Sequence, residues 1–310
     1  HALESLLMED WHHEKLSILL MNKINEEFDG ELSMALEMFQ GKYHRRFFNQ
    51  LISSQLDVDR LDYLKRDSFF TGVSEGSVNT QRIISMMNVC DDELVIDEKG
   101  VYSIENFLTA RMFMYWQVYY HKTSALAEHL LVKILSRAKQ LISEGKSIEA
   151  YGNLKYFLYK TDFEKATEED INRFTQLDDT DVLSAIKTWQ NADDFVLSYF
   201  CRAVVQRKFP KTVFSSHPFD QKIIEEKTTK ANDFFGINNG ELLVEQISRT
   251  LLPYDTEKQT IFLLKKNGEK IKLEDAETQI LSAHINQPTT KNILYFPREI
   301  SNGAFDVKKY

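Results

Sequence analysis

Glycine and proline are scarce in this sequence, which has 11 glycines and 5 prolines among 310 residues. Both residues interrupt regular helices. Their scarcity, with frequent leucine, glutamate, lysine and alanine, favours a mainly helical protein. A chain of this length can bury a sizeable core, in one large domain or two smaller ones.

Cysteine and long apolar runs are also lacking. The sequence has two cysteines, Cys90 and Cys201. Two are too few for a disulfide framework, so we expect the protein in a reducing cytoplasm. No uninterrupted apolar run reaches about 18 residues, so no membrane-spanning helix is expected. The first residues have no basic stretch before an apolar one, so no signal peptide is expected either.

Positive charge is in deficit, with 38 basic against 47 acidic residues and a net charge of -9. This balance argues against sequence-independent binding to a nucleic-acid backbone. A small phosphorylated ligand stays possible, because a bound metal or a local basic pocket supplies positive charge.

The sequence does not start with methionine, and its first residues (Leu3, Leu6, Leu7, Trp11) already follow a helical spacing. We therefore expect a fragment, a processed product or an incomplete chain.

Hydrophobic spacing predicts a helical body over residues 1–210 and a smaller α+β portion over 211–310. Within the body we expect helices over 55–70, 77–89 and 105–142, and a β-hairpin that pairs 93–97 with 101–104.

In the C-terminal portion we expect a helix over 220–235 that ends at Gly236. The Asn267-Gly268 pair predicts a type I′ hairpin turn. Strands are expected over 212–214, 242–251, 260–264 and 293–296.

The helix over 55–70 carries Asp59, Tyr63 and Asp67 at i, i+4 and i+8, which places them on one stripe with Arg60 beside it. A carboxylate is a hard ligand for a divalent metal, an arginine suits phosphate, and a tyrosine can contact a sugar. On spacing alone, the simpler interpretation is a solvated helix with an Asp62–Arg66 ion pair.

The complete sequence of this helix is more informative than the spacing of its acidic residues alone. Residues 57–67, followed by Thr71-Gly72, resemble the D-V-D-(K/R)-x-D-Y-x-x-R-D segment of HD-type deoxynucleoside triphosphate triphosphohydrolases. The resemblance implies that Asp59 is the last carboxylate ligand of an H…HD…D metal site. It also implies that Arg60, Tyr63 and Asp67 face the phosphates and sugar of the substrate.

Histidines near the start resemble two further segments of that family. His1 and Glu4 match the end of a G-H-G-P-F-S-H-x-(F/L)-(D/E) segment, and His13 matches the second histidine of (T/H)-H-E-x-x-S. The resemblance implies that these three residues are catalytic, because they would lie over the scissile phosphate for acid–base work or charge stabilisation. Without it, His13 would be assigned to the surface or to a helix cap.

The sequence departs from the family in one respect, because it contains no His-Asp dipeptide. Three of the four metal ligands are therefore expected upstream of His1. We expect the chain as given neither to bind the metal in the family manner nor to turn over substrate.

The helix over 105–142 has a second polar stripe of Arg111, Tyr115, Tyr119 and Lys122. Other residues of this helix already supply an apolar face, so the polar stripe needs a separate explanation. The segment resembles the family's R-x-x-x-(H/Y)-x-x-x-Y-x-H-K helix. The resemblance implies that Arg111 binds a terminal phosphate and that Tyr119 contacts the sugar or base.

Taken together, the resemblance implies an HD-domain helical bundle that hydrolyses nucleotides with a divalent metal (Mg, Mn, Fe, Ni, Co or Zn). The leading substrate is a dNTP, giving a deoxynucleoside and triphosphate. The alternatives are another phosphate ester or cyclic nucleotide, and a non-catalytic nucleotide-binding or oligomeric scaffold. The expected partners are a nucleotide or other phosphorylated small molecule and further copies of the same chain.

Overall fold

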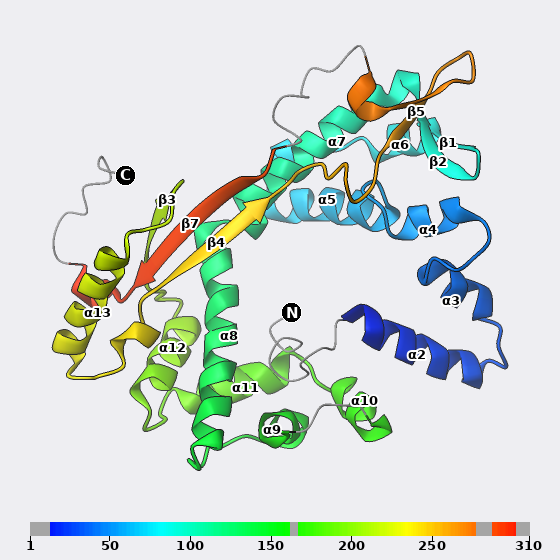
Figure 1. Cartoon of the computed structure of the whole chain (residues 1–310). Coiled ribbons are helices and arrows are strands. Elements are labelled where there is room, and N and C mark those ends of the chain that lie inside the picture. Colours follow the sequence, from blue (N-terminus) through cyan, green and yellow to red (C-terminus); the bar gives the residue numbers. More distant parts are fainter. Residues whose placement is uncertain (1–12, 162–166, 277–286, 302–310) are drawn as a thin grey trace. The chain divides into compact units, whose positions relative to one another are not determined.

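A computed structural model describes residues 13–161, 167–276 and 287–301 (Figure 1). The chain divides into two compact units. The first unit takes residues 1–20, 122–248 and 291–310, and the second takes 21–121 and 249–290. Each unit is described by itself.

The second unit contains the two segments predicted to bind substrate. Its helices are α3 (Ser33–Phe39), α4 (Arg46–Ile52), α5 (Val58–Thr71), α6 (Thr80–Met86) and α7 (Val101–Met114), followed by the π-helical turn η3 (Tyr115–Tyr119). Three short 3-10 turns are η1 (Ser74–Gly76), η2 (Glu98–Gly100) and η5 (Leu273–Asp275).

A small sheet completes the second unit, with strand order β1-β2-β5-β6. The strands are β1 (Met87–Cys90), β2 (Glu93–Asp97), β5 (Phe262–Leu264) and β6 (Lys270–Lys272). β2 runs antiparallel to β1 and parallel to β5, so the sheet joins two distant parts of the sequence.

The predicted hairpin between 93–97 and 101–104 is wrong. β2 pairs with β1 instead, through a turn at Asp91 and Asp92 whose φ angles are 51° and 61°, as a type I′ turn requires. Residues 101–104 begin α7, because Val101 and Ile104 lie three positions apart and are both buried on its apolar face. The helix predicted over 77–89 accordingly ends at Met86, where β1 begins.

The Asn267-Gly268 turn joins β5 to β6, but its predicted type is wrong. The amide of Gly268 donates to the carbonyl of Lys265 at 2.9 Å, and only Gly268 of this turn has a positive φ, at 85°. A type I turn followed by a left-handed glycine matches this pattern, whereas type I′ needs two positive φ values.

The core of the second unit forms where α5 and α7 lie side by side (Figure 1). Leu61 and Leu64 of α5 pack with Ile104 and Phe107 of α7 and with Ile96 of β2. These contacts bury one face of α5 and leave its opposite face to the predicted site.

The first unit is built around the long helix α8 (Figure 1). Its helices are α8 (Lys122–Ser143), α9 (Gly152–Tyr159), α10 (Glu168–Phe174), α11 (Asp179–Trp189), α12 (Phe195–Val205), α13 (Gln221–Phe235) and the first turns of α2 (His13–Glu27), with the 3-10 turns η4 (Gly240–Leu242) and η6 (Arg298–Ile300). The sheet β3-β7-β4 consists of β3 (Lys211–Ser215), β7 (Thr289–Phe296) and β4 (Glu245–Leu251). Among the helices of the described ranges, none is long and apolar enough to cross a bilayer.

The prediction of a mainly helical chain with an α+β C-terminal portion is confirmed. The helix over 220–235 ends as predicted at Gly236, whose φ is 66°. The continuous helix predicted over 105–142 is wrong, because η3 and the residues Tyr120 and His121 separate α7 from α8. Residues 211–310 contribute to both compact units, so this division differs from the predicted boundary near 210.

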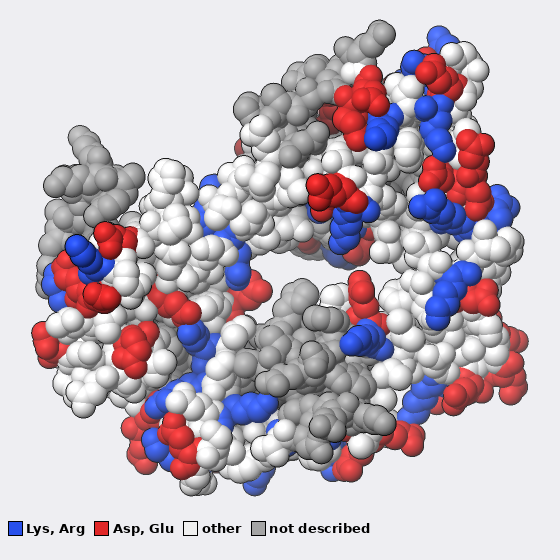
Figure 2. Space-filling view, viewed as in Figure 1, with Lys and Arg blue, Asp and Glu red and all other residues white. Residues whose placement is uncertain are grey.

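Charged side chains of both signs lie on the face shown in Figure 2. In the view of Figure 2, acidic and basic groups are interspersed over the visible face. This mixture agrees with the moderate net charge of -9.

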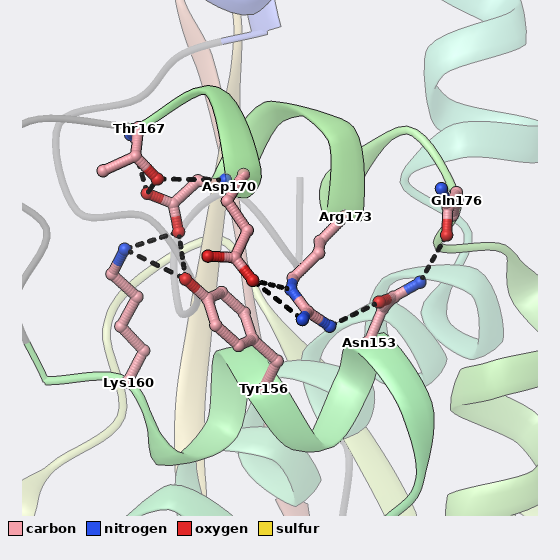
Figure 3. Close-up of polar contacts among 8 residues, drawn as sticks. Asn153, Tyr156, Lys160, Thr167, Asp170, Arg173 and Gln176 are labelled. Atoms are coloured by element: carbon pink, nitrogen blue, oxygen red, sulfur yellow. Dashed lines mark hydrogen bonds and ion pairs between the residues drawn. The ribbon is translucent and has the colours of Figure 1, made fainter.

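A buried carboxylate joins α9 to α10 in the first unit (Figure 3). Asp170 is 1% exposed, forms a capping box with Thr167, accepts from the Tyr156 hydroxyl at 2.9 Å and pairs with Lys160. Burial opposes ionisation, but the hydrogen bonds from Lys160 and Thr167 outweigh it and lower the pKa of Asp170 to about 2. The ionised form therefore stabilises the fold.

Replacing Asp170 with asparagine should lower the free energy of unfolding at pH 7 by about 2 kcal/mol, since the folded pKa lies below its ordinary value of 3.8. This stabilisation is present above pH 3.8 and is lost as the pH falls toward 2, so the difference from the wild type should shrink over that window. Urea unfolding at several pH values measures it. Glu169→Gln, at an exposed partner of Arg173, is the control; an equal penalty in both variants would contradict the assignment.

Candidate functional site

The helix that carries the predicted metal ligand begins and ends for local reasons. Asp57 caps α5 by accepting from the backbone amide of Arg60 at 2.8 Å, and Gly72 ends the helix with a φ of 71°. Both signals are visible in the sequence, so the helix predicted over 55–70 is confirmed with bounds of Val58–Thr71.

Three of the four carboxylates on this segment are already engaged. Asp57 is buried, caps the helix and pairs with Arg60, and Asp62 pairs with Arg66 at 2.8 Å. Asp67 accepts a hydrogen bond from the Tyr119 hydroxyl at 2.6 Å.

Asp59 differs from these three. It is exposed in the first turn of α5, and no described residue hydrogen-bonds to its carboxylate or pairs with it. Its carboxylate lies at the positive end of the helix dipole. Of the carboxylates on α5 and its cap, Asp59 is therefore the one whose oxygens are available to a cation.

The rings of Tyr63, Tyr115 and Tyr119 form a group that we call the tyrosine cluster. The ring centroids of Tyr63 and Tyr119 are 6.1 Å apart and those of Tyr115 and Tyr119 are 5.2 Å apart, in edge-to-face arrangements. The Tyr119 hydroxyl donates to Asp67, which ties η3 to α5. The structure thus brings together residues that lie more than 50 positions apart in the sequence.

The tyrosine hydroxyls stay protonated far above neutral pH. Burial, then the hydrogen bond to Asp67, raises the pKa of Tyr119. Burial, then the electrostatic effect of Tyr115, raises the pKa of Tyr63, against the opposing charges of Arg111 and Arg60. At pH 7 these hydroxyls are therefore neutral, and the proton of the Tyr119 hydroxyl is donated to Asp67.

Arg111 lies at the edge of the tyrosine cluster. Its guanidinium carbon is 5.7 Å from the ring centroid of Tyr115, and its Nη1 donates to the carbonyl of Pro253 at 3.3 Å. Its Nε is buried and has no hydrogen-bond partner among the described residues. A buried N–H without an acceptor costs about 1–3 kcal/mol, so this position suits an anionic ligand such as phosphate.

Arg60 is placed differently from the other four predicted substrate residues. Its guanidinium pairs with Asp57 and donates to the carbonyl of Ser54, at the start of α5. It influences Tyr63 through its charge. The structure therefore joins Tyr63, Asp67, Arg111 and Tyr119 in one cluster and holds Arg60 at the helix cap.

The predicted catalytic residues near the start are less fully described. His13 is exposed at the first turn of α2 and belongs to the first unit, while His1 and Glu4 lie outside the described residues. Within the described ranges, no group of three or more His, Cys, Asp or Glu side chains could hold a metal ion. Among the described residues, Asp59 is therefore not part of such a group.

Tyr115 belongs to the site although the sequence interpretation assigned it no role. Its spacing to Arg111 and Tyr119 was the available signal. The π-helical turn could not be predicted, because nothing in the spacing distinguishes it from a continued α-helix.

Tyr119→Phe should lower the free energy of unfolding by about 1–2 kcal/mol, because it removes a hydrogen bond to a carboxylate while keeping the ring. Chemical denaturation of the chain measures the change. Tyr102→Phe removes a hydroxyl from a ring that is 54% exposed on α7, and should leave stability unchanged. Equal stability of Tyr119→Phe and the wild type would argue against the bond to Asp67.

Comparison with known proteins connects this chain to a family. Residues 78–156 match the family described as "HD associated region". A crystal structure of a phosphohydrolase from Bacteroides thetaiotaomicron is 40% identical, with a TM-score of 0.89 over 96% of this chain and 75% of that one.

Two curated proteins are also similar. The uncharacterized protein YwfO of Bacillus subtilis is 32% identical over 91% of this chain and 64% of its own length. A Dictyostelium discoideum protein named as a deoxynucleoside triphosphate triphosphohydrolase SAMHD1 homolog is 27% identical over 48% of this chain and 32% of its own. The chain spans less than two thirds of the length of these curated relatives.

Proposed function

Because the chain belongs to the HD superfamily of phosphohydrolases, we propose that the full-length protein is a metal-dependent hydrolase of nucleotides. Its proposed substrate is a dNTP, which yields a deoxynucleoside and triphosphate. The observation that carries the proposal is the cluster of Tyr63, Asp67, Arg111 and Tyr119, in which a buried arginine N–H has no acceptor among the residues that the structure describes.

Phosphate recognition would depend on Arg111. Its Nε–H is buried and its charge reaches Tyr63, so a phosphate oxygen placed there would gain a charge-assisted hydrogen bond. The neutral tyrosine hydroxyls beside it add no negative charge. Both features favour an anionic ligand with several oxygens.

Sugar recognition would depend on Asp67 and Tyr119. Their 2.6 Å hydrogen bond holds a carboxylate beside an aromatic ring, a combination that suits the hydroxyl and the apolar face of a sugar. The similarity to the Dictyostelium triphosphohydrolase homologue supports a dNTP as the substrate.

The proposed metal would be held by Asp59 together with ligands from residues outside this chain. A carboxylate oxygen fits a divalent cation, and Asp59 is exposed and unengaged within the described structure. When bound, a divalent metal supplies positive charge to a phosphoryl oxygen and makes water more acidic. We propose His1, Glu4 and His13 as the groups that exchange protons or stabilise charge at the scissile phosphate.

Two alternatives compete with this proposal. Arg111 and Asp59 would serve another phosphate ester equally well, although the Asp67–Tyr119 pair favours a substrate with a sugar. A cyclic nucleotide contains a sugar and would satisfy both features. A non-catalytic nucleotide-binding scaffold would keep the binding cluster without turnover. We further propose a cytoplasmic homo-oligomer whose HD-domain helical bundle includes residues outside this chain.

In the full-length protein, Asp59→Ala should remove bound metal and lower hydrolysis by about two orders of magnitude or more. Metal content by mass spectrometry, and release of triphosphate and orthophosphate from each dNTP, measure the two effects. Asp62→Ala is the matched control, since it removes an exposed ion pair with Arg66 on the same helix, worth about 0.3–0.5 kcal/mol, and should keep metal and activity.

Two results would count against the proposal. Retained metal and turnover in Asp59→Ala would refute its role as a ligand. If the wild-type full-length protein, supplied with divalent metals, hydrolyses neither nucleotides nor other phosphate esters, the scaffold alternative is correct.

A further inference from the structure

The C-terminal end of α5 exposes two adjacent phenylalanines. Phe69 is 80% exposed and Phe70 is 78% exposed, although both belong to a helix whose other face is buried. Their rings contact each other edge to face, with centroids 5.3 Å apart. Keeping two large apolar rings in water is unfavourable, so a ligand that covers either one would be stabilised.

Helix geometry places the two phenylalanines at different angles around the helix axis. Successive residues of an α-helix are turned by about 100°, so Phe70 lies about 20° from both Asp59 and Tyr63 and about 60° from Asp67. Phe70 therefore continues the stripe of the candidate site. Phe69 instead lies about 20° from Asp62, on the stripe of the Asp62–Arg66 ion pair.

The order along the helix axis is also informative. With a rise of about 1.5 Å per residue, Phe70 lies about 4.5 Å beyond Asp67, about 10 Å beyond Tyr63 and about 16 Å beyond Asp59. The stripe thus runs from the free carboxylate, through the cluster that suits phosphate and sugar, to an open aromatic ring. A nucleoside triphosphate has phosphates, sugar and base in the same order.

We propose that Phe70 is the stacking platform for the base of the nucleotide substrate. This inference rests on the proposed function, because it assigns the base to a position next to the proposed sugar and phosphate residues. A phenylalanine ring has no hydrogen-bonding group, so it stacks on any base without reading its edge. The site should therefore accept all four bases, with purines favoured by their larger stacking area.

A competing occupant of the same surface is a second copy of the chain. A protein–protein contact would use both exposed rings, because they are adjacent and equally exposed. Base stacking would use Phe70 alone, since Phe69 lies off the stripe. Phe69 is thus a matched control, of the same residue type and exposure on the same helix.

The test compares Phe70→Ala, Phe70→Trp and Phe69→Ala in the full-length protein. Phe70→Ala should raise the KM for dATP about tenfold, because it removes the stacking of one base. Its kcat should stay within about twofold of the wild-type value. Phe70→Trp should restore the wild-type KM, and Phe69→Ala should not change it. Hydrolysis of deoxyribose 5-triphosphate, which has no base, should be the same in all variants.

A binding experiment keeps this inference separate from the proposed hydrolysis. The fluorescence of 2-aminopurine deoxyriboside triphosphate should be quenched on binding to wild type and Phe69→Ala, and much less on binding to Phe70→Ala. If wild type hydrolyses no dNTP, the proposed function fails, and this titration still decides the role of Phe70.

Two outcomes would overturn the inference. One is equal KM and equal quenching in Phe70→Ala and Phe69→Ala. The other is a loss of self-association in both variants, measured by light scattering, while KM and quenching stay unchanged. That result would assign the surface to contact with a second copy of the chain. Circular dichroism checks that each variant is folded, and Phe70→Leu replaces Phe70→Ala if that variant is not.

Discussion

The burial of one face of α5 is the constraint on which the candidate site depends. Leu61 and Leu64 are fixed in the core of the second unit, and Leu64 has no exposed surface. Because a helix repeats every 3.6 residues, burying these positions turns Asp59 and Tyr63 toward the opposite side. The same apolar contacts that stabilise the unit therefore also orient its polar stripe.

The π-helical turn η3 supplies the second half of the cluster. The amide of Tyr120 donates to the carbonyl of Tyr115 at 2.6 Å, five residues back, which widens the helix locally. Within this widened turn Tyr115 lies near Arg111 and the Tyr119 hydroxyl reaches Asp67. Such turns are uncommon and occur frequently at functional sites, so the irregularity coincides with the residues that we assign to substrate binding.

Local signals in the sequence predict α5 well. Its start depends on the Asp57 cap and its end on Gly72, and both act within a few residues. The pairing of β2 could not be predicted in the same way. The residues after Gly100 suit a strand or a helix, and the parallel partner of β2 lies at 262–264, far along the sequence.

The hydrogen-bond partners of each acidic residue could likewise not be predicted from the sequence. Spacing placed Asp59 and Asp67 on one stripe as equals, but the structure engages Asp67 with Tyr119, whereas Asp59 has no side-chain partner among the described residues. That difference depends on η3, which lies about 50 residues away and is irregular. A pattern of residue types therefore identified the members of the cluster, while their partners required the folded chain.

Charge explains how an acidic protein can present a site for an anion. The net charge is -9, and on the face shown in Figure 2 charged groups of both signs are interspersed. At physiological ionic strength, exposed charges are screened beyond about 8 Å, so a ligand in the site would respond mainly to its nearest neighbours. Around the tyrosine cluster those include the half-buried Arg111, whose Nε is buried, and hydroxyls that stay neutral because burial raises their pKa. Asp67 is the carboxylate nearest to them, and its hydrogen bond to Tyr119 disperses part of its charge. The local balance thus favours phosphate next to Arg111, while Asp59 contributes to binding an anion only when a cation neutralises it.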